Sequence, residues 1–254
     1  MDTIWEVPDE LWEQVEPVLL KLDPPKATGR KRADPRPILN GVVFRRRSGC
    51  QWNKLPREFG DDSTVHRTFQ RWVERGALGR IWGMLVKECE ELGSVDWEWQ
   101  SADAAMGKAV WGDEIGPNPT DRGKAGSKRS ILVEGGGGPL SVVVAGANVH
   151  DTRLLRATLE AIVVERPQPT GETPQHLCPD KGVRQPHGEE KLDAAGQKRF
   201  PARRWVVERT LAWLSKCRAI LVRYEKKAAN YLGLVQLACA LLWFRRKHKL
   251  TLLR

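Results

Sequence analysis

The stretch of sequence that decides the fold is Ser130-Ile-Leu-Val-Glu-Gly-Gly-Gly-Gly-Pro-Leu-Ser-Val-Val-Val144. Its two apolar runs, residues 130–133 and 140–144, are separated by Glu134, four glycines and Pro139. Short apolar runs on either side of a connection rich in Gly and Pro are typical of a β-hairpin. The glycines have no helix start after them, so they are predicted to form the turn and not a phosphate-binding loop.

Further elements are predicted on both sides of this hairpin. Residues 97–105 predict an earlier strand, and residues 150–164 predict a helix with one apolar side. Residues 177–179 predict the end of a short strand just before Asp180, and the chain is predicted to be helical again from Arg203. The order is strand, strand, strand, helix, strand, helix, which predicts an α/β domain over residues 93–254.

The first ninety residues have a different pattern, in which apolar side chains recur at helical spacing. Helices are predicted after Pro8, near residues 38–49, briefly over 55–59, over 65–73 and over 78–89, with Asp62 or Ser63 as the cap of the fourth. Residues 1–92 are therefore predicted to form a helical domain. The fold class as a whole is α+β: a helical N-terminal domain followed by an α/β domain.

The composition favours a polyanionic partner. The 254 residues carry a net charge of +10, and the pI is about 9.6. DNA is the first candidate and an acidic membrane surface the second. The apolar stretch 231–244 is shorter than the roughly 20 residues that span a bilayer, so a buried helix and no membrane insertion are expected. Five scattered cysteines without a C-x-x-C pair, and a start without a signal peptide, fit a reducing cytoplasm.

The basic N-terminal residues are candidate DNA contacts. Residues 26–54 hold nine Lys or Arg and a single acid, Asp34, and lysine and arginine neutralise phosphates. The predicted helices around Asp61 fit a helix-turn-helix whose second helix turns His66 and other polar residues outward. A small helical bundle with a solvated basic face accounts for the same pattern. The predicted DNA contacts of this half are Arg45, Arg46, Arg47, Arg67, Gln70 and Arg71.

Three acids are candidates for a metal site: Asp103 in the first strand, Asp180 after the short strand, and Glu208 early in a helix. Two-metal phosphoryl transfer needs carboxylates that converge on Mg²⁺ ions roughly 3.5–4 Å apart. Mn²⁺ is the alternative ion. Structural roles remain open: Glu208 could pair with Arg204 across one helical turn. Asp151 competes with Asp180, although a helix N-cap is the favoured role for Asp151.

Several longer motifs occur in one order along nearly the whole chain. They are Trp12 to Leu20, Asn40-Gly-Val-Val-Phe-Arg45, Trp52 to Leu55, Val65 to Trp72, Pro117-Asn-Pro-Thr-Asp-Arg-Gly-Lys-Ala-Gly-Ser-Lys128, Ala147-Asn-Val-His-Asp151, Asp180-Lys-Gly182, Val206-Val-Glu-Arg-Thr-Leu-Ala-Trp213 and Arg223-Tyr-Glu-Lys226. Together they resemble the bacterial insertion-sequence transposases of the DDE superfamily, in the insertion-sequence-5 group.

The resemblance implies a ribonuclease-H-like catalytic domain in which Asp103, Asp180 and Glu208 are the catalytic and metal-binding residues. It implies that Arg204 and Lys216 touch transposon-end DNA. It further implies Mg²⁺ (or Mn²⁺) as cofactor, terminal inverted repeats and target DNA as partners, a homodimer on DNA, and a place in the bacterial cytoplasm at the nucleoid.

Two departures from the family pattern bear on activity. Val183 stands where the family usually has Tyr, and only 28 positions separate Asp180 from Glu208, which indicates an internal deletion. A misplacement of about 1 Å can cost roughly a hundredfold in rate. The leading hypothesis is an active transposase. The alternatives are a catalytically degenerate relative that binds DNA and represses transposition, and a structure-specific nuclease.

Overall fold

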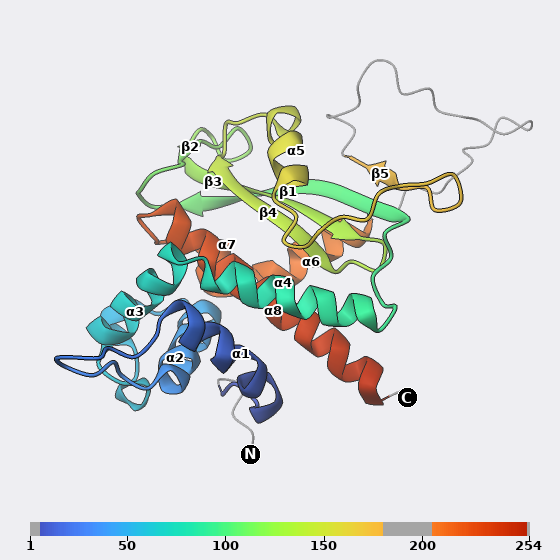
Figure 1. Cartoon of the computed structure of the whole chain (residues 1–254). Helices are drawn as coiled ribbons and strands as arrows, with labels where there is room; N and C mark the ends of the chain where they lie inside the picture. Colours follow the sequence, from blue (N-terminus) through green and yellow to red (C-terminus); the bar gives the residue numbers. More distant parts are fainter. Residues whose placement is uncertain (1–5, 180–204, 253–254) are drawn as a thin grey trace, which may run out of the picture.

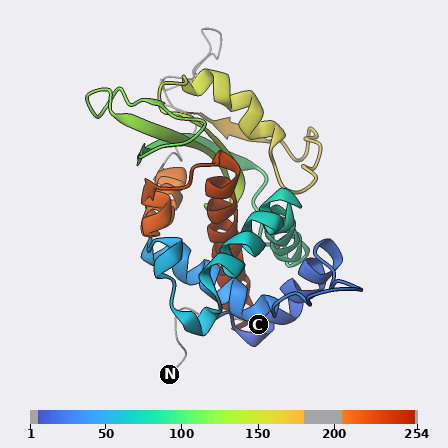
Figure 2. The same ribbon diagram turned by 90° about the vertical axis from the view of Figure 1, so that its left-hand side faces the viewer.

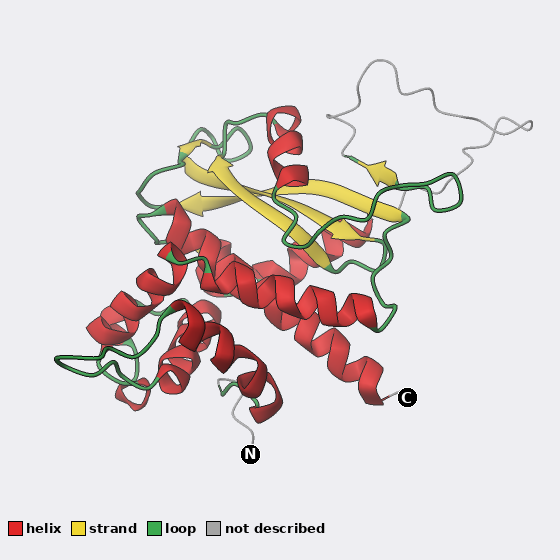
Figure 3. Cartoon of the chain, in the orientation of Figure 1, coloured by secondary structure: helices red, strands yellow, loops and turns green. Residues whose placement is uncertain are grey.

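The computed structural model describes residues 6–179 and 205–252 and has a layered α+β architecture. A mixed β-sheet carries one helix, α5, on one face, and helices α4, α6, α7 and α8 on the other (Figures 1 and 3). Helices α1, α2 and α3 pack beyond α4 and α8, farthest from the sheet. The predicted division into a helical half and a half with strands is therefore confirmed at the level of fold class.

The N-terminal half is helical, as expected. Its elements are α1 (Asp9–Leu22), α2 (Pro35–Ser48), the 3₁₀ helices η1 (Trp52–Lys54) and η2 (Arg57–Phe59), α3 (Asp62–Glu74) and α4 (Ala77–Glu91). The cap of α3 is Asp61, whose carboxylate accepts from the backbone N–H of Thr64 at 2.9 Å, so the expectation of Asp62 or Ser63 is off by one or two residues. Two 3₁₀ helices precede Asp61 instead of the α-helix that a helix-turn-helix expects there.

The sheet is built around the predicted hairpin. Its strands are β1 (Trp99–Ala109), β2 (Gly116–Pro117), β3 (Ala125–Glu134), β4 (Pro139–Gly146), β5 (His176–Cys178) and β6 (Val222–Arg223). The long strands β1, β3 and β4 pair antiparallel in the order β4-β3-β1. On the other side of β1, β5 pairs parallel with its start and β6 parallel with its end. The hairpin prediction for residues 130–144 is confirmed, with its turn at the four glycines.

The helices of the second half are α5 (Asp151–Glu160), α6 (Trp205–Ser215), α7 (Arg218–Leu221) and α8 (Ala228–Leu252). Helix α5 ends four residues before the predicted end at 164. Its N-cap is His150 and not Asp151, because the imidazole of His150 accepts from the backbone N–H of Thr152. The predicted order of three strands, helix, strand and helix is confirmed, apart from the two-residue strands β2 and β6.

Helix α8 is the central helix of the molecule. Figure 2 shows it running between α4 and the α6–α7 pair, and it also packs on β4. Residues 228–249 are long and apolar enough to cross a membrane by length and composition alone, but 56% of the most apolar window is buried inside the protein. The prediction of a buried helix is confirmed for this segment.

The helical half and the sheet share one hydrophobic core. Trp82 of α4 and Trp243 of α8 are both 1% exposed, and both indole N–H groups donate to the carbonyl of Pro139, at 3.1 and 2.7 Å. Two large side chains from different halves of the chain thus meet at the first residue of β4. The predicted domain boundary between residues 92 and 93 falls in the connection between α4 and β1.

Candidate active site

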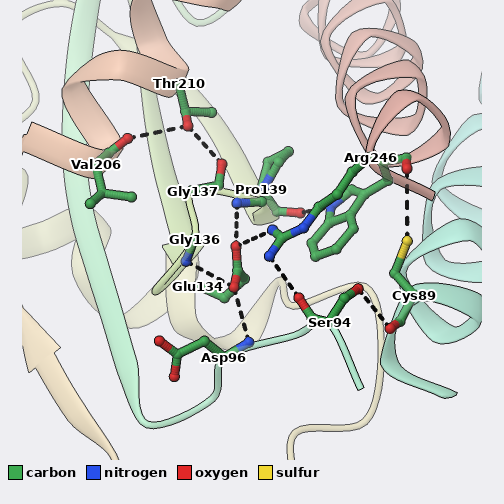
Figure 4. A network of polar contacts seen from close by, with 12 residues as sticks. Cys89, Ser94, Asp96, Glu134, Gly136, Gly137, Pro139, Val206, Thr210 and Arg246 are labelled. Carbon is green, nitrogen blue, oxygen red and sulfur yellow. Dashed lines mark hydrogen bonds and ion pairs between the residues drawn. The ribbon is translucent and has the colours of Figure 1, made fainter. Parts of the chain in front are cut away.

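The carboxylate of Glu134, which is fully buried, holds the turn between β3 and β4 through the contacts drawn in Figure 4. Its oxygens accept from the backbone N–H of Asp96 at 3.0 Å and of Gly136 at 2.9 Å, and also from Gly138. Arg246 of α8 completes the set with an ion pair of 2.6 Å. A buried carboxylate is stable only when it is paired and hydrogen-bonded in this way. The turn is therefore a rigid support.

Helix α6 is docked on this support. The hydroxyl of Thr210, fully buried, donates to the carbonyl of Gly137 at 2.7 Å, and the guanidinium of Arg209 donates to the carbonyl of Gly136 at 2.6 Å (Figure 4 shows the first of these bonds). The same guanidinium lies over the rings of Trp205 and Trp213, at 4.8 and 4.9 Å. Through these contacts the glycine turn sets the position of the helix that carries Glu208.

Glu208 lies in the first turn of α6, and its side chain is exposed. Helix α6 packs on β1 and β3, on the face of the sheet opposite α5. The charge of Glu208 near the start of the helix is favoured by the helix dipole. The sequence prediction that Glu208 sits near the start of a helix is confirmed.

Asp103 lies in β1 and faces the same layer. Its register partner in β3 is Ile131, and the next pair on that face is Ala105 with Arg129. Side chains of directly opposed residues share a face of the sheet, and those two residues along share it too. Arg129 reaches the hydroxyl of Tyr231 in α8 at 2.6 Å, so this face is the one covered by α6, α7 and α8. Asp103 is half-buried, and its carboxylate accepts from the N–H of Ala104 at 2.7 Å.

Asp151 lies on the other side of the sheet. It forms an ion pair of 2.8 Å with Lys128, which alternates with Arg129 and so faces α5. Ser130, on the same face as Lys128, accepts a hydrogen bond from Thr158 of α5 at 2.7 Å. Asp151 and Asp103 therefore lie on opposite faces of the sheet.

Asp180 and Arg204 lie outside the described residues. The last described residue pair between β1 and β5 is Ser101 with Cys178, in parallel register. Among the residues that the structure describes, no group of three or more His, Cys, Asp or Glu side chains gathers to hold a metal ion. The described share of the predicted carboxylate set is Asp103 and Glu208, whose oxygens are the ligand type that Mg²⁺ takes.

The three consecutive arginines of α2 differ in how deeply they are buried. Arg45 is 2% exposed and pairs with Glu225 at 3.1 Å, so in this fold it joins α2 to the segment after β6 instead of facing solvent. Burial lowers the pKa of Arg45, and Glu225 partly opposes that shift. Arg46 is 7% exposed, and Arg47 is half-buried. Of the three, Arg45 is therefore out of reach of DNA in this structure.

Among the predicted base-reading residues of α3, only Arg67 is exposed. Gln70 is half-buried. Arg71 binds the buried carboxylate of Asp23 at 2.8 Å, together with Arg32 and Arg75, so its head group is held against the protein. The outward face that the helical period predicted for α3 is thus confirmed at Arg67 and is occupied by an ion-pair cluster at Arg71.

Comparisons with known proteins cover part of the chain. A family model described as "Putative transposase of IS4/5 family" matches residues 7–82. A protein of Burkholderia cepacia described as "Putative transposase for insertion sequence element IS402" is 31% identical over 150 residues, which are 52% of this chain and 70% of that protein. The chain belongs to the IS4/5 family of transposases.

Two further relatives of this transposase have no assigned activity. An "Insertion element IS402 uncharacterized 16.2 kDa protein" of Burkholderia cepacia is 30% identical over 118 residues, or 44% of this chain and 80% of its own length. "Uncharacterized protein y4sN" of Sinorhizobium fredii is 29% identical over 103 residues, or 40% and 74%. No solved structure matches the chain.

The structure adds one feature of the transposase that sequence reasoning missed, a cavity of about 640 Å³ beside α6. Lys216, which follows α6 and is predicted to touch DNA, lines this cavity together with Arg46 and Arg47 of α2 and with cations near the end of α8. The available signal was the charge of residues 198–249, which hold fourteen Lys or Arg and two acids. The count of Lys and Arg does not predict which of these side chains line one cavity, because they come from different helices.

Proposed function

We propose that this transposase cleaves DNA at transposon ends and transfers the strand into target DNA, with Asp103, Asp180 and Glu208 holding two Mg²⁺ (or Mn²⁺) ions. The observation that carries the proposal is that Asp103 faces the helical layer that contains α6, the helix of Glu208. A carboxylate on the central strand and one on the helix packed against it are the arrangement that the DDE resemblance implies.

The sheet topology supports a ribonuclease-H-like catalytic domain. Three long antiparallel strands in the order β4-β3-β1 are extended by β5, which runs parallel to β1. Helix α5 connects β4 to β5 across one face, and α6 lies on the other. This is the layout in which the resemblance expects the first acid at the middle strand and the last acid on the covering helix.

Asp180 is proposed as the third member from the sequence. It follows two residues after Cys178, the last residue of β5, which pairs with Ser101 in parallel register. Asp180 itself lies outside the described residues, and its place in the carboxylate set rests on the Asp180-Lys-Gly182 motif of the resemblance.

The roles of this chain's residues follow from their positions. The carboxylates would hold the two ions, which when bound supply activation of a water or 3′-hydroxyl and stabilisation of the leaving oxygen. Arg204 and Lys216 flank Glu208 in the sequence and would hold the DNA backbone beside it. Arg67, exposed on α3, would contact the terminal inverted repeat. A homodimer on paired ends, working on the nucleoid in the cytoplasm, belongs to the same proposal.

The decisive test is a cleavage assay on DNA that carries the element's own ends, with Mg²⁺ or Mn²⁺. We expect nicking at the ends by the native chain. In Asp103→Asn nicking should fall by two orders of magnitude or more, because loss of one carboxylate removes a metal ligand, on the order of 3 kcal/mol. Asp151→Asn is the matched control, since Asp151 pairs with Lys128 on the opposite face. Equal nicking by the native chain and Asp103→Asn would refute the carboxylate assignment.

The second candidate is a DNA-binding relative that represses transposition. The observation in its favour is the short interval of 28 positions between Asp180 and Glu208. For this function, end DNA would be bound without nicking, and Arg67→Ala would abolish repression while Asp103→Asn left it unchanged. A third candidate, a structure-specific nuclease, would cut DNA lacking the inverted repeats equally well in the same assay.

A further inference from the structure

All the charged side chains that line the cavity beside α6 are positive. It lies where α2, α6, the end of α8 and the β3–β4 turn meet. No Asp or Glu is among the described residues that line it, and Glu134 beneath the turn is already matched to Arg246. The cationic side chains lining it are Arg46, Arg47, Lys216, Arg245, Arg246 and Lys249.

Among the residues that the structure describes, Arg46 is a buried cation without a counter-charge. It is 7% exposed, its Nε is buried without a partner, and its guanidinium forms no hydrogen bond or ion pair with a described residue. Burial lowers the pKa of Arg46, Cys217 and Cys239 partly oppose that shift, and the positive charges of Arg245 and Arg47 add to it. An unpaired buried charge is strongly unfavourable. An anion that enters the cavity would give this guanidinium the charge partner that it lacks.

The other buried arginines show what Arg46 lacks. Arg45, its neighbour in the same helix, pairs with Glu225 at 3.1 Å, and Arg223 pairs with Asp113 at 2.9 Å. Arg129 donates to two neutral oxygens of α7 and α8. Each of those guanidinium groups thus has at least one internal partner, although Nε and Nη1 of Arg45 and Nε of Arg129 are buried without one. The contrast within one helix, between Arg45 and Arg46, points to a ligand from outside as the partner of Arg46.

We propose that this cavity binds a backbone phosphate of DNA, with Arg46 at its wall and Lys216, Arg245 and Lys249 around it. A phosphodiester offers two non-bridging oxygens that share one negative charge and match the fork of a guanidinium. Lys216, Arg245 and Lys249 are exposed, so a strand can approach. This inference rests on the proposed function and adds to it a specific phosphate contact just beyond the C-terminal end of the helix of Glu208.

The native chain carries a reporter in the cavity, because Cys217 lines it and is half-buried. Thiol alkylation by iodoacetamide, read by mass spectrometry peptide by peptide, would be measured with and without a fluorescein-labelled duplex. Cys50, half-buried but not a lining residue, is the internal reference. We expect the duplex to slow alkylation of Cys217 several-fold more than alkylation of Cys50. Inorganic phosphate, compared with chloride at equal ionic strength, is the small-anion arm.

Charge variants supply the second readout. In the double variant Lys216→Ala/Arg245→Ala, the slope of log Kobs against log salt should become shallower by about 1–2, since each lost phosphate contact removes about 0.9. The same variant should lose the protection of Cys217. Arg153→Ala, exposed on α5 across the sheet, should change neither. Both substituted residues are exposed, so the fold should survive, and circular dichroism checks this.

The outcomes separate this inference from the proposed function. Nicking at transposon ends without protection of Cys217, or with an unchanged salt slope in the double variant, would overturn the cavity assignment and leave the function standing. Protection by inorganic phosphate but not by the duplex would make it a small-anion site and overturn the DNA assignment. No binding of DNA at all would overturn both.

Discussion

Single buried charged residues join distant segments of this molecule, and Glu134 is the plainest example. Its carboxylate is fully buried between three backbone N–H groups and Arg246 (Figure 4). The sequence shows it only as a polar residue at the end of an apolar run. Its partners come from the turn beside it, from the connection before β1 and from α8, 112 positions away. The contact with Arg246 is therefore invisible to any local pattern.

We predict that Glu134→Ala lowers the free energy of unfolding by about 3–5 kcal/mol, because Arg246 and three backbone donors lose a buried partner. Urea unfolding followed by circular dichroism measures the effect. Glu160→Ala is the control, since Glu160 only pairs with exposed Arg156 along α5 and should cause little change. Equal losses in the two variants would contradict the role assigned to Glu134.

The motif Arg223-Tyr-Glu-Lys226 gains a structural meaning at the same scale. Arg223 and Glu225 are 1% and 4% exposed, and Glu225 accepts from the guanidinium of Arg45 and the indole of Trp52, each at 3.1 Å. A motif that the resemblance linked to transposases thus joins α2 and η1 to the strand end at β6. The carboxylate of Glu225 is therefore paired with Arg45 and Trp52 and is not counted among the candidate metal ligands.

At the scale of elements, the connection between α2 and α3 is held by ring stacking. Trp52 of η1 stacks on His66 of α3, with ring centroids 4.4 Å apart. Burial lowers the pKa of His66, and nearby Arg45 lowers it further, while Glu225 and Asp62 raise it. The imidazole Nε2 is buried without a partner, so the neutral ring fits this site better than the charged ring.

This stacking predicts a pH dependence of stability. The unfolded histidine takes up a proton near its ordinary pKa of about 6.5, while the folded one takes it up only at lower pH. The unfolded state therefore binds more protons as the pH falls below about 6.5, and the free energy of unfolding should drop there. His66→Phe, which keeps the stacking, should drop less when urea unfolding is compared at pH 7.5 and about 5.5. A drop as large in His66→Phe as in the native chain would exclude His66 as the cause.

At the scale of the whole molecule, the two halves are bound by one core. Trp82 and Trp243 meet at the carbonyl of Pro139, and α4 lies along α8 (Figure 1). The motif that carries Glu225 adds a polar connection between the same halves. Halves that share buried contacts of this kind are expected to unfold together.

We predict one cooperative unfolding transition for the full chain, seen at the same urea midpoint by tryptophan fluorescence and far-ultraviolet circular dichroism. Trp82→Ala should shift both midpoints together, with a loss of about 3–5 kcal/mol, because a large side chain is removed from the common core. Two separate transitions, only one of them sensitive to Trp82→Ala, would show that residues 1–92 and 93–254 are independent folding units.

The sequence by itself determined most of the elements and the family of this protein. Apolar spacing predicted the hairpin at 130–144 and the helices of the first ninety residues, because the period of a strand or helix is local. The family was recognisable from motifs such as Val206 to Trp213, and the acids were recognisable by type as candidate metal ligands. Boundaries were less certain, as the caps at Asp61 and His150 show, since neighbouring polar residues compete for the same backbone N–H groups.

Only the tertiary structure decided which of these residues meet. It placed Asp103 on the face of α6 and Asp151 on the opposite face, and it buried Arg45 against Glu225 while leaving Arg46 beside a cavity. The physical reason is the same in each case. The sequence gives the number and positions of the arginines. The partner of a buried arginine such as Arg45 lies far away in the sequence, so only the packing of the chain shows which residue it is.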